Sequence, residues 1–227
     1  MKKYKAVVFD FDGTLSNRQI SAYNKYKDDL QQIFPDINTE SFEFEAIIQS
    51  CLTWDQFGTI KRSYVFDQLG KTYNLDQLLM EKMSKKWSGE FYKYTILREG
   101  VFETLEKLGK DYTLGCITNG DSNGQHSKLD YCGIKEVLDA VIVSGDLGFH
   151  KPDPKIFIEI SRMLDVLPEE IIYVGDTFYA DIYGATLAGC TPIWLITDKD
   201  HPCGLKVNRV DRFTDLVNVI NEIEESR

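Results

Sequence analysis

The stretch that decides the fold is VVFDFDGTL, residues 7–15. A short apolar run, typical of a buried β-strand, ends in two carboxylates one residue apart and then breaks at a glycine. Side chains alternate faces along an extended chain, so Asp10 and Asp12 are expected to point the same way at the end of the strand. Two like charges this close need compensation, and Mg²⁺ prefers carboxylate and carbonyl oxygens as ligands. The pattern predicts a cleft that binds a metal ion.

The same Asp12-Gly13 pair could instead form the turn of a β-hairpin. The apolar run ahead of it is typical of a strand buried on both faces, whereas hairpin strands commonly alternate apolar and polar residues. No candidate partner strand follows Gly13-Thr14. The hairpin therefore fits this stretch poorly.

The composition is that of an ordinary globular protein, and it restricts the possible partners. With 227 residues, the chain can form one large domain or a core domain with a smaller insert. A formal net charge of -10 argues against a nucleic acid polymer or an anionic membrane surface as a partner. A phosphate-bearing substrate must therefore be attracted locally, by a few placed cations and a metal ion.

The cysteines and the hydropathy pattern bear on the compartment. No stretch approaches the length of a membrane span, and the basic start of the chain leads into a strand instead of the apolar core of a signal peptide. Five cysteines, an odd number without CxxC spacing, suit neither a disulfide framework nor a zinc site. Reduced thiols in a cytoplasmic protein are the simpler account. We expect a monomer or a weak homodimer.

Helical spacing dominates the chain after Thr14. Helices are predicted at residues 20–34, 39–51, 57–69 and 75–91, with turns at 35–38 and 70–74. Arg18, Lys61, Arg62 and Tyr64 could reach a substrate, but basic residues in a helical block are more often solvated, and we expect this of Arg18 and Arg62. Five aromatic residues are expected to form the core of this block: Tyr23, Tyr26, Phe57, Tyr64 and Phe66. Residues 16–97 are therefore predicted to be a small helical domain.

Strands and helices alternate from residue 100 onward. The expected strands are residues 112–117, 140–143, 171–174 and 192–196, and the expected helices are 100–108, 155–164, 181–188 and 213–224, with a short helix at 129–131 closed by Gly133. Strands separated by single helices predict a parallel sheet covered on both faces. The predicted fold is a three-layer α/β/α, Rossmann-like core of residues 1–15 and 98–227, with the helical domain 16–97 inserted.

Polar residues follow four of these strands. In a parallel sheet the ligand site lies at the carboxyl ends of the strands, near the point where the strand order reverses. The residues at such ends are Asp10 with Asp12, Thr118 with Asn119, Lys151, and Asp176. Their convergence on one rim of the sheet predicts a single site.

These groups fit the chemistry of phosphoryl transfer. A carboxylate can attack phosphorus if the charge on the phosphoryl oxygens is neutralised and the leaving oxygen receives a proton. Lys151 supplies a cation, and the Thr118 hydroxyl beside Asn119 supplies hydrogen-bond donors. Gly120 allows backbone N–H groups to come close to a phosphate.

Two further carboxylates complete the predicted site. Asp176 follows a glycine at a strand end and is a natural further metal ligand. Asp181, one helical turn later, is placed to orient either Lys151 or a metal-bound water.

Four segments of the chain resemble the four motifs of the haloacid dehalogenase-like hydrolase superfamily. They are DFDGT at 10–14, Thr118-Asn119, Lys151-Pro152, and Gly175-Asp176 with Asp181, and they come in the family's order. The resemblance covers the core to about Ile196, and the helical block lies where this family inserts its first type of cap. It implies a Mg²⁺-dependent phosphatase that hydrolyses a small phosphate monoester through an aspartyl-phosphate. The layout is most similar to the nucleotidase and sugar-phosphatase branch, which implies a nucleoside monophosphate or a sugar or organic acid phosphate as substrate.

The resemblance also implies a role for each site residue. Asp10 would be the nucleophile, and Asp12 the general acid and base. Mg²⁺ would be held by Asp10, the backbone carbonyl of Asp12, and Asp176. Three more residues would support the reacting groups: Thr118 and Lys151 by gripping the phosphoryl group, and Asp181 by supporting the metal and Lys151. The cap would supply the specificity.

Three other functions remain to be weighed. A dehalogenase of the same superfamily forms an ester at carbon without Mg²⁺ and lacks the second aspartate, but Asp12 is present here. A phosphomutase would need a His and Arg pattern after Leu15, which is missing. A non-enzymatic binding module would be expected to have lost one of the four charged residues Asp10, Asp12, Lys151 and Asp176. All four are retained.

Overall fold

The chain folds into two compact units in the computed structural model, which describes residues 2–196 and 202–226. One unit consists of Met1–Ser16 with Leu97–Arg227, and the other of Asn17–Ile96. Each junction lies one residue inside the boundary predicted from the sequence. Among the described residues, no helix combines the length and the apolar character that crossing a bilayer requires.

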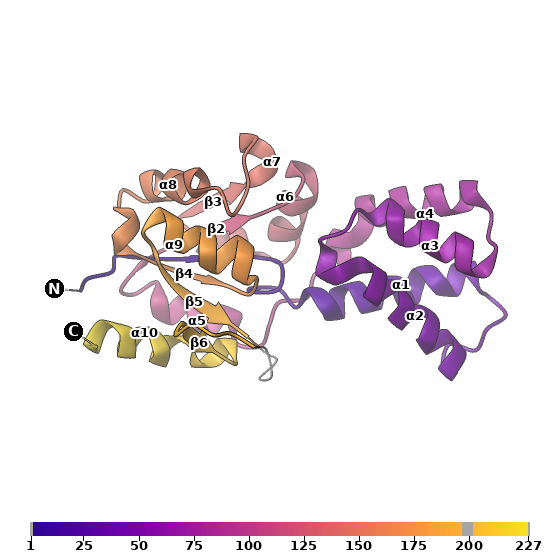
Figure 1. The fold of residues 1–227 in the computed structure, drawn as a ribbon, viewed down its shortest axis with the longest axis horizontal. Coiled ribbons are helices and arrows are strands. Elements are labelled where there is room, and N and C mark those ends of the chain that lie inside the picture. Colours follow the sequence, from indigo (N-terminus) through magenta and orange to yellow (C-terminus); the bar gives the residue numbers. More distant parts are fainter. Residues whose placement is uncertain (1, 197–201, 227) are drawn as a thin grey trace. The chain divides into compact units, whose positions relative to one another are not determined.

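The first unit is built on a parallel sheet of six strands, in the order β3-β2-β1-β4-β5-β6 (Figure 1). The strands are β1 (Ala6–Phe9), β2 (Thr113–Thr118), β3 (Ala140–Val143), β4 (Ile171–Gly175), β5 (Thr191–Leu195) and β6 (Asn208–Val210). This confirms the predicted parallel α/β fold. The edge strand β6 was not predicted, because only Val210 of its three residues is buried and the segment shows no apolar pattern.

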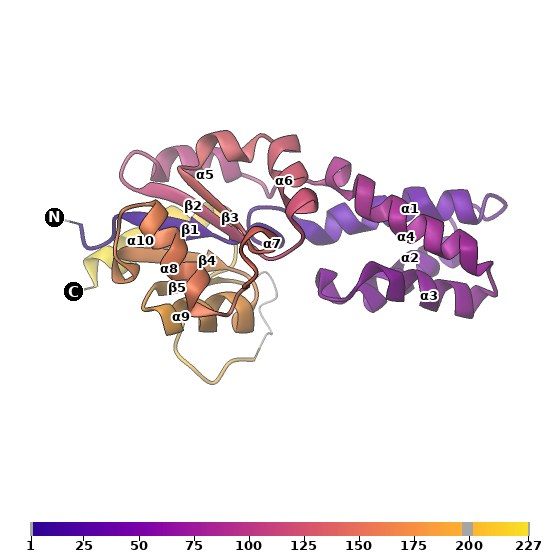
Figure 2. The ribbon, with the colours of Figure 1, turned by 90° about the horizontal axis from the view of Figure 1, so that it is seen from above.

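Helices cover both faces of this sheet, as Figure 2 shows. They are α5 (Val101–Leu108), α6 (Ser122–Tyr131), α7 (Ser144–Leu147), α8 (Pro154–Met163), α9 (Gly184–Ala188) and α10 (Leu216–Glu225). Val7 and Phe9 of β1 belong to the core that includes side chains of α5, α6 and α10. Ala6 and Val8 belong to the core formed with α8 and α9. The alternation of faces along β1 therefore explains why this strand is apolar throughout.

The strand order reverses between β1 and β4. The chain passes from β1 outward through β2 to β3 and then returns to place β4 on the other side of β1. Phe9 pairs with Val174 in the register, and the Asp10 amide donates to the Val174 carbonyl at 2.9 Å. Asp10 and the Gly175-Asp176 pair therefore follow neighbouring strands at the same level, at the switch point where ligands bind in such sheets.

Helix α6 is longer than predicted. It begins at Ser122, whereas the sequence had indicated only residues 129–131. Asp121 caps it, because its carboxylate accepts the Gly124 amide at 2.8 Å. The first two turns are polar and show no apolar periodicity, and this is why the pattern failed to predict them.

The second unit consists mainly of four helices, α1 (Arg18–Ile33), α2 (Phe42–Asp55), α3 (Arg62–Tyr73) and α4 (Gln77–Glu90). The prediction that a turn begins at residue 70 is wrong. Helix α3 continues through Gly70 and ends at Asn74, which has a left-handed backbone conformation. A Cβ on Gly70 would lie 3.0 Å from Cγ of Met80. Close packing of α3 against α4 therefore explains this glycine, and no turn is needed there.

Two arginines of the second unit are not solvated as expected. Arg18 donates to Asp55 at 2.8 Å, and Arg62 also binds this fully buried carboxylate. The buried charge of Asp55 requires such partners. Of the five aromatic residues, Tyr26 and Phe66 are buried in the core and Tyr23 packs against it, but Tyr64 is exposed and the ring of Phe57 is 74% exposed.

Candidate active site

Lys151 lies at the centre of a buried polar cluster at the carboxyl ends of the strands. Its ammonium donates to Oδ1 of Asp10 at 2.6 Å and to Oδ1 of Asp181 at 2.7 Å. It also donates to the Ile117 carbonyl at 3.0 Å and to the Tyr173 hydroxyl at 3.1 Å. The cluster joins Asp10, Lys151 and Asp181, which come after β1, β3 and β4 in the chain.

Burial and charge shift the proton affinities of these groups in a consistent way. Burial raises the pKa of Asp10 well above its ordinary value, although the Lys151 ammonium opposes this shift. Burial disfavours the charged form of Lys151, but the carboxylates of Asp10 and Asp181 outweigh it and raise the pKa of Lys151. Three carboxylates share this region with one lysine, so a further cation would favour the ionised form of Asp10.

A metal ion fits these carboxylates. Oxygens of Asp10, Asp176 and Asp181 lie within 4.8 Å of one another. Oδ2 of Asp10 is buried and has no hydrogen-bond partner within residues 2–196 and 202–226. Both oxygens of Asp181 are already engaged, Oδ1 by Lys151 and Tyr173 and Oδ2 by the Thr177 amide at 2.9 Å. An all-oxygen donor set with an unpaired buried oxygen suits Mg²⁺, with Asp10 and Asp176 as the available carboxylates.

The loop after β1 is shaped to receive Asp176. Gly13 has φ +98°, and a Cβ there would lie 2.1 Å from Oδ2 of Asp176. Arg98 holds the turn, because its guanidinium donates twice to the Gly13 carbonyl, at 2.9 and 2.6 Å. On the other side, the Trp194 indole donates to the backbone carbonyl of Asp176 at 2.8 Å. Glycine at position 13 is thus required both by its backbone angle and by the approach of a carboxylate.

Asp12 has different partners from Asp10. Strand β1 ends at Phe9, so the alternation of an extended chain does not continue to Asp12. Oδ2 of Asp12 accepts from Lys128 at 2.5 Å and from the Gln125 amide at 2.9 Å. Its side chain is not one of the three carboxylates of the cluster. The two aspartates of the first motif therefore interact with different lysines.

Thr118, the last residue of β2, and the two residues that follow it also have distinct environments. The Thr118 hydroxyl is buried, and no residue of the described ranges hydrogen-bonds to it. The Asn119 side chain binds the backbone of Lys151, donating to its carbonyl at 3.0 Å and accepting its amide at 2.9 Å. The Gly120 amide donates to Oγ of Ser144 at 3.1 Å. Thr118 thus offers an unpaired donor, whereas Asn119 holds the Lys151 loop.

Four residues of this region were not predicted from the sequence: Arg98, Gln125, Lys128 and Tyr173. Gln125 and Lys128 are three residues apart on α6, so they lie on the same side of the helix. Their spacing, directly after Thr118-Asn119, was the available signal. Arg98 and Tyr173 carry no such signal, because only the tertiary fold brings them to the Gly13 turn and to Lys151.

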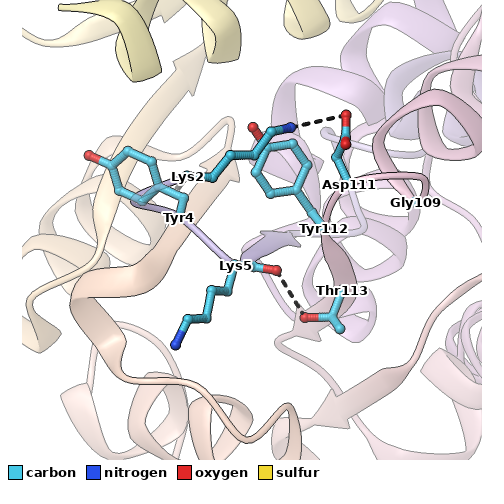
Figure 3. A pocket seen from close by; sticks show the side chains of 7 residues that line it. All are labelled: Lys2, Tyr4, Lys5, Gly109, Asp111, Tyr112 and Thr113. Carbon is cyan, nitrogen blue, oxygen red and sulfur yellow. Dashed lines mark hydrogen bonds and ion pairs between the residues drawn. The ribbon is translucent and has the colours of Figure 1, made fainter.

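A separate cavity lies at the opposite end of the sheet. It has a volume of about 500 Å³ and is lined by Lys2, Tyr4, Lys5, Gly109, Asp111, Tyr112 and Thr113 (Figure 3). These residues precede or begin β1 and β2, so the cavity lies at the amino ends of the strands. Lys2 is paired with Asp111 at 3.0 Å. The cavity is therefore distinct from the carboxylate cluster.

Comparison with known proteins agrees with this fold. A family model described as haloacid dehalogenase-like hydrolase matches residues 7–195. A glyceraldehyde 3-phosphate phosphatase from Pyrococcus furiosus is 30% identical over 208 residues, which cover 86% of this chain and 81% of that protein. The human N-acylneuraminate-9-phosphatase is 26% identical over 212 residues, covering 86% of this chain and 84% of that protein.

A solved structure shares the fold over nearly the whole chain. The HAD-hydrolase YfnB from Bacillus subtilis, bound to magnesium, superposes with a TM-score of 0.73 and 25% identity. The match covers 97% of this chain and 100% of that one. The six-stranded parallel sheet with its covering helices is the Rossmann-like α/β core of this class of hydrolase. The chain belongs to the haloacid dehalogenase-like hydrolases.

Proposed function

We propose that this protein is a Mg²⁺-dependent phosphatase that hydrolyses a small phosphate monoester through an aspartyl-phosphate on Asp10. Two relatives that match over four fifths of their length are named phosphatases, which supports a hydrolase of phosphate monoesters. Their names concern a triose phosphate and an acyl sugar phosphate. We therefore include sugar phosphates among the candidate substrates, with nucleoside monophosphates and organic acid phosphates. The second unit, Asn17–Ile96, is proposed to act as the cap that recognises the leaving group of the substrate.

The proposed reaction has two steps. The carboxylate of Asp10 attacks phosphorus, the bond from phosphorus to the ester oxygen breaks, and Asp12 donates a proton to the leaving oxygen. Asp12 then takes a proton from a water molecule, which attacks the phosphorus and releases inorganic phosphate and the Asp10 carboxylate. Thr118 and Lys151 hold the phosphoryl oxygens during both steps. Asp10, the backbone carbonyl of Asp12, and Asp176 would hold Mg²⁺, which would supply positive charge that favours binding of the phosphoryl group.

The observation that carries this proposal is a pair of unsatisfied polar atoms at the ends of β1 and β2. Oδ2 of Asp10 and Oγ1 of Thr118 are both buried, and neither has a partner in the part of the chain that the structure describes. Buried polar groups are nearly always hydrogen-bonded, so unpaired ones need an explanation. A phosphoryl group and its metal ion would satisfy both atoms. A dehalogenase or a dead binding core gives no reason to retain Asp12 and Asp176 together with them.

The cytoplasm is the proposed compartment. All five cysteines are free thiols, and three of them are buried. This suits a reducing environment.

The experiment that tests the function combines a trapped intermediate with a matched pair of variants. Asp10→Asn should fold but lose essentially all activity, because an amide is neither an adequate nucleophile nor a charged metal ligand, and the uncatalysed reaction is extremely slow. Asp130→Asn, which changes an exposed carboxylate paired with Lys135, should keep the activity of the parent. Acid-quenched parent enzyme should carry labelled phosphate on Asp10, and EDTA should abolish turnover. If Asp10→Asn kept an activity within about tenfold of the parent, Asp10 would be excluded as the nucleophile.

A further inference from the structure

Helix α6 presents two side chains to the carboxylate of Asp12. Nζ of Lys128 lies 2.5 Å from Oδ2 of Asp12, and Nε2 of Gln125 lies 2.9 Å from the same oxygen. Lys128 and Gln125 are both buried. Ser16 adds a longer contact, 3.4 Å from its hydroxyl to Oδ1. A lysine and an amide that converge on one carboxylate oxygen restrain both the direction and the plane of that group.

The amide of Gln125 is oriented by its acceptors. Its Nε2 also donates to the Asn119 carbonyl at 2.8 Å, so it bridges the loop after β1 and the loop after β2. A carboxylate and a carbonyl can only accept hydrogen bonds, which requires the NH₂ group to face both of them. Gly120 makes this possible, because a Cβ there would lie 2.7 Å from Nε2 of Gln125. The glycine of the second motif thus leaves room for the glutamine.

The contact with Lys128 differs from an ordinary surface ion pair. Exposed pairs contribute little, and Lys135 with Asp130 further along the chain is one of these. The side chain of Lys128 is 11% exposed and that of Asp12 is 20% exposed. Holding a lysine in such a position is costly without its partner, so Lys128 and Asp12 depend on each other.

We propose that Lys128 and Gln125 are positioning residues that hold the carboxylate of Asp12 in line for proton transfer to the leaving oxygen and from the attacking water. The proposal rests on the phosphatase function proposed above. It assigns neither residue a contact with the phosphoryl group. Their effect on the reaction passes through Asp12 alone.

The test separates this role from substrate binding and from general stability. Lys128→Met removes the charge at similar length, Lys128→Arg restores it, and Gln125→Met removes the amide. Lys135→Met is the matched control, an exposed lysine with a carboxylate partner outside the site. Each is made in the parent and in Asp12→Asn, and kcat and KM are measured with glycerol phosphate and with p-nitrophenyl phosphate. Circular dichroism verifies that each variant is folded.

Misplacement of a catalytic group by about 1 Å can reduce a rate by roughly 10²-fold. We expect Lys128→Met to lower kcat for glycerol phosphate by about that factor, with KM within about threefold. With p-nitrophenyl phosphate, whose leaving group needs little protonation, the phosphoenzyme should form and then accumulate, because its hydrolysis needs Asp12 as base. Lys128→Arg should recover most of the loss, and Lys135→Met should behave as the parent. In Asp12→Asn, adding Lys128→Met should change kcat by less than about threefold.

Other results would overturn the proposal. A rise in KM with unchanged kcat would make Lys128 a substrate-binding residue, and an equal loss in the Asp12→Asn background would show that it acts elsewhere. Unchanged activity in both Lys128→Met and Gln125→Met would show that neither residue positions Asp12 for catalysis. If Lys128→Met does not fold, the same measurements on Gln125→Met decide whether α6 positions Asp12. A parent enzyme that forms no phosphoenzyme would instead refute the proposed function.

Discussion

At the scale of single residues, Asp176 links the metal site to pH. Its carboxylate is half-buried, and its pKa is raised to about 7, first by burial and then by the charge of Asp181. The pKa of an aspartate in an unfolded chain is about 3.9, so the folded protein binds this proton more tightly. The stabilisation is therefore complete below about pH 4 and is lost as the pH rises to about 7. A metal ion that binds the ionised carboxylate would restore the stabilisation that is lost when the proton leaves.

We therefore expect the metal-free protein to melt at a lower temperature at pH 8 than at pH 5. The increase in Tm on adding Mg²⁺ should be larger at pH 8 than at pH 5. At 100 times its Kd, Mg²⁺ would add about 2.7 kcal/mol, or roughly 5 to 10 °C in Tm for a chain of this size. Differential scanning fluorimetry with Mg²⁺ or EDTA measures this, with Asp176→Asn as the control that loses the response. A Mg²⁺ effect independent of pH would contradict the link to Asp176.

Gly13 leads to a second prediction at this scale. In Gly13→Ala the new Cβ would collide with the Asp176 carboxylate, so both the strained φ and the clash act together. Strain of this kind costs about 1–3 kcal/mol. We expect weaker Mg²⁺ binding and a loss of activity of roughly 10²-fold.

Gly133→Ala is the control that separates the backbone strain from the clash with Asp176. Gly133 has φ +69°, and no described atom lies within 4 Å of its would-be Cβ. This variant should lose stability by a similar strain energy and keep its Mg²⁺ affinity. Equal Mg²⁺ affinities in both variants, measured by calorimetry, would show that the contact between positions 13 and 176 does not matter for the metal.

At the scale of elements, the start of α6 should matter for catalysis and not only for stability. Asp121 caps α6, and Asp76 caps α4 in the second unit, each accepting a backbone amide at 2.8 Å. Replacing an N-cap residue by alanine costs about 1 kcal/mol. Asp121→Ala and Asp76→Ala should therefore lower the free energy of unfolding by similar amounts.

Only Asp121→Ala is expected to reduce kcat, because only α6 carries Gln125 and Lys128. Asp121→Asn, which can still cap the helix, should restore both properties. Steady-state kinetics and chemical denaturation of the three variants provide the measurement. A similar loss of kcat in Asp76→Ala would indicate that lower stability alone explains the effect.

At the scale of the whole molecule, the division into two units predicts separable functions. The units join at residues 16/17 and 96/97, and the proposed phosphoryl site is built from the first unit alone. Replacing residues 17–96 by the corresponding segment of another family member should change which esters are hydrolysed. Mg²⁺ dependence and the need for Asp10 should remain. If the chimera folds and hydrolyses the same panel of phosphate esters in the same ratios as the parent, specificity lies in the first unit.

The sequence by itself was enough to predict the parallel sheet, the family and the strand ends that carry Asp10, Thr118, Lys151 and Asp176. Apolar strands, helical spacing and strand-end motifs are local patterns, and the parallel topology brings such ends to one rim. Asp10 and Asp176 come directly after β1 and β4, and Thr118 is the last residue of β2.

Only the tertiary structure decided which groups pair within that rim. Strand alternation suggested one shared environment for Asp10 and Asp12, yet Asp10 binds Lys151 and Asp12 binds Lys128 and Gln125. Likewise, Arg18 and Arg62 turned out to surround the buried Asp55. The physical reason is that a hydrogen bond or ion pair depends on distances of a few ångströms between distant parts of the chain, whereas periodicity reports only which face of its own element a side chain occupies.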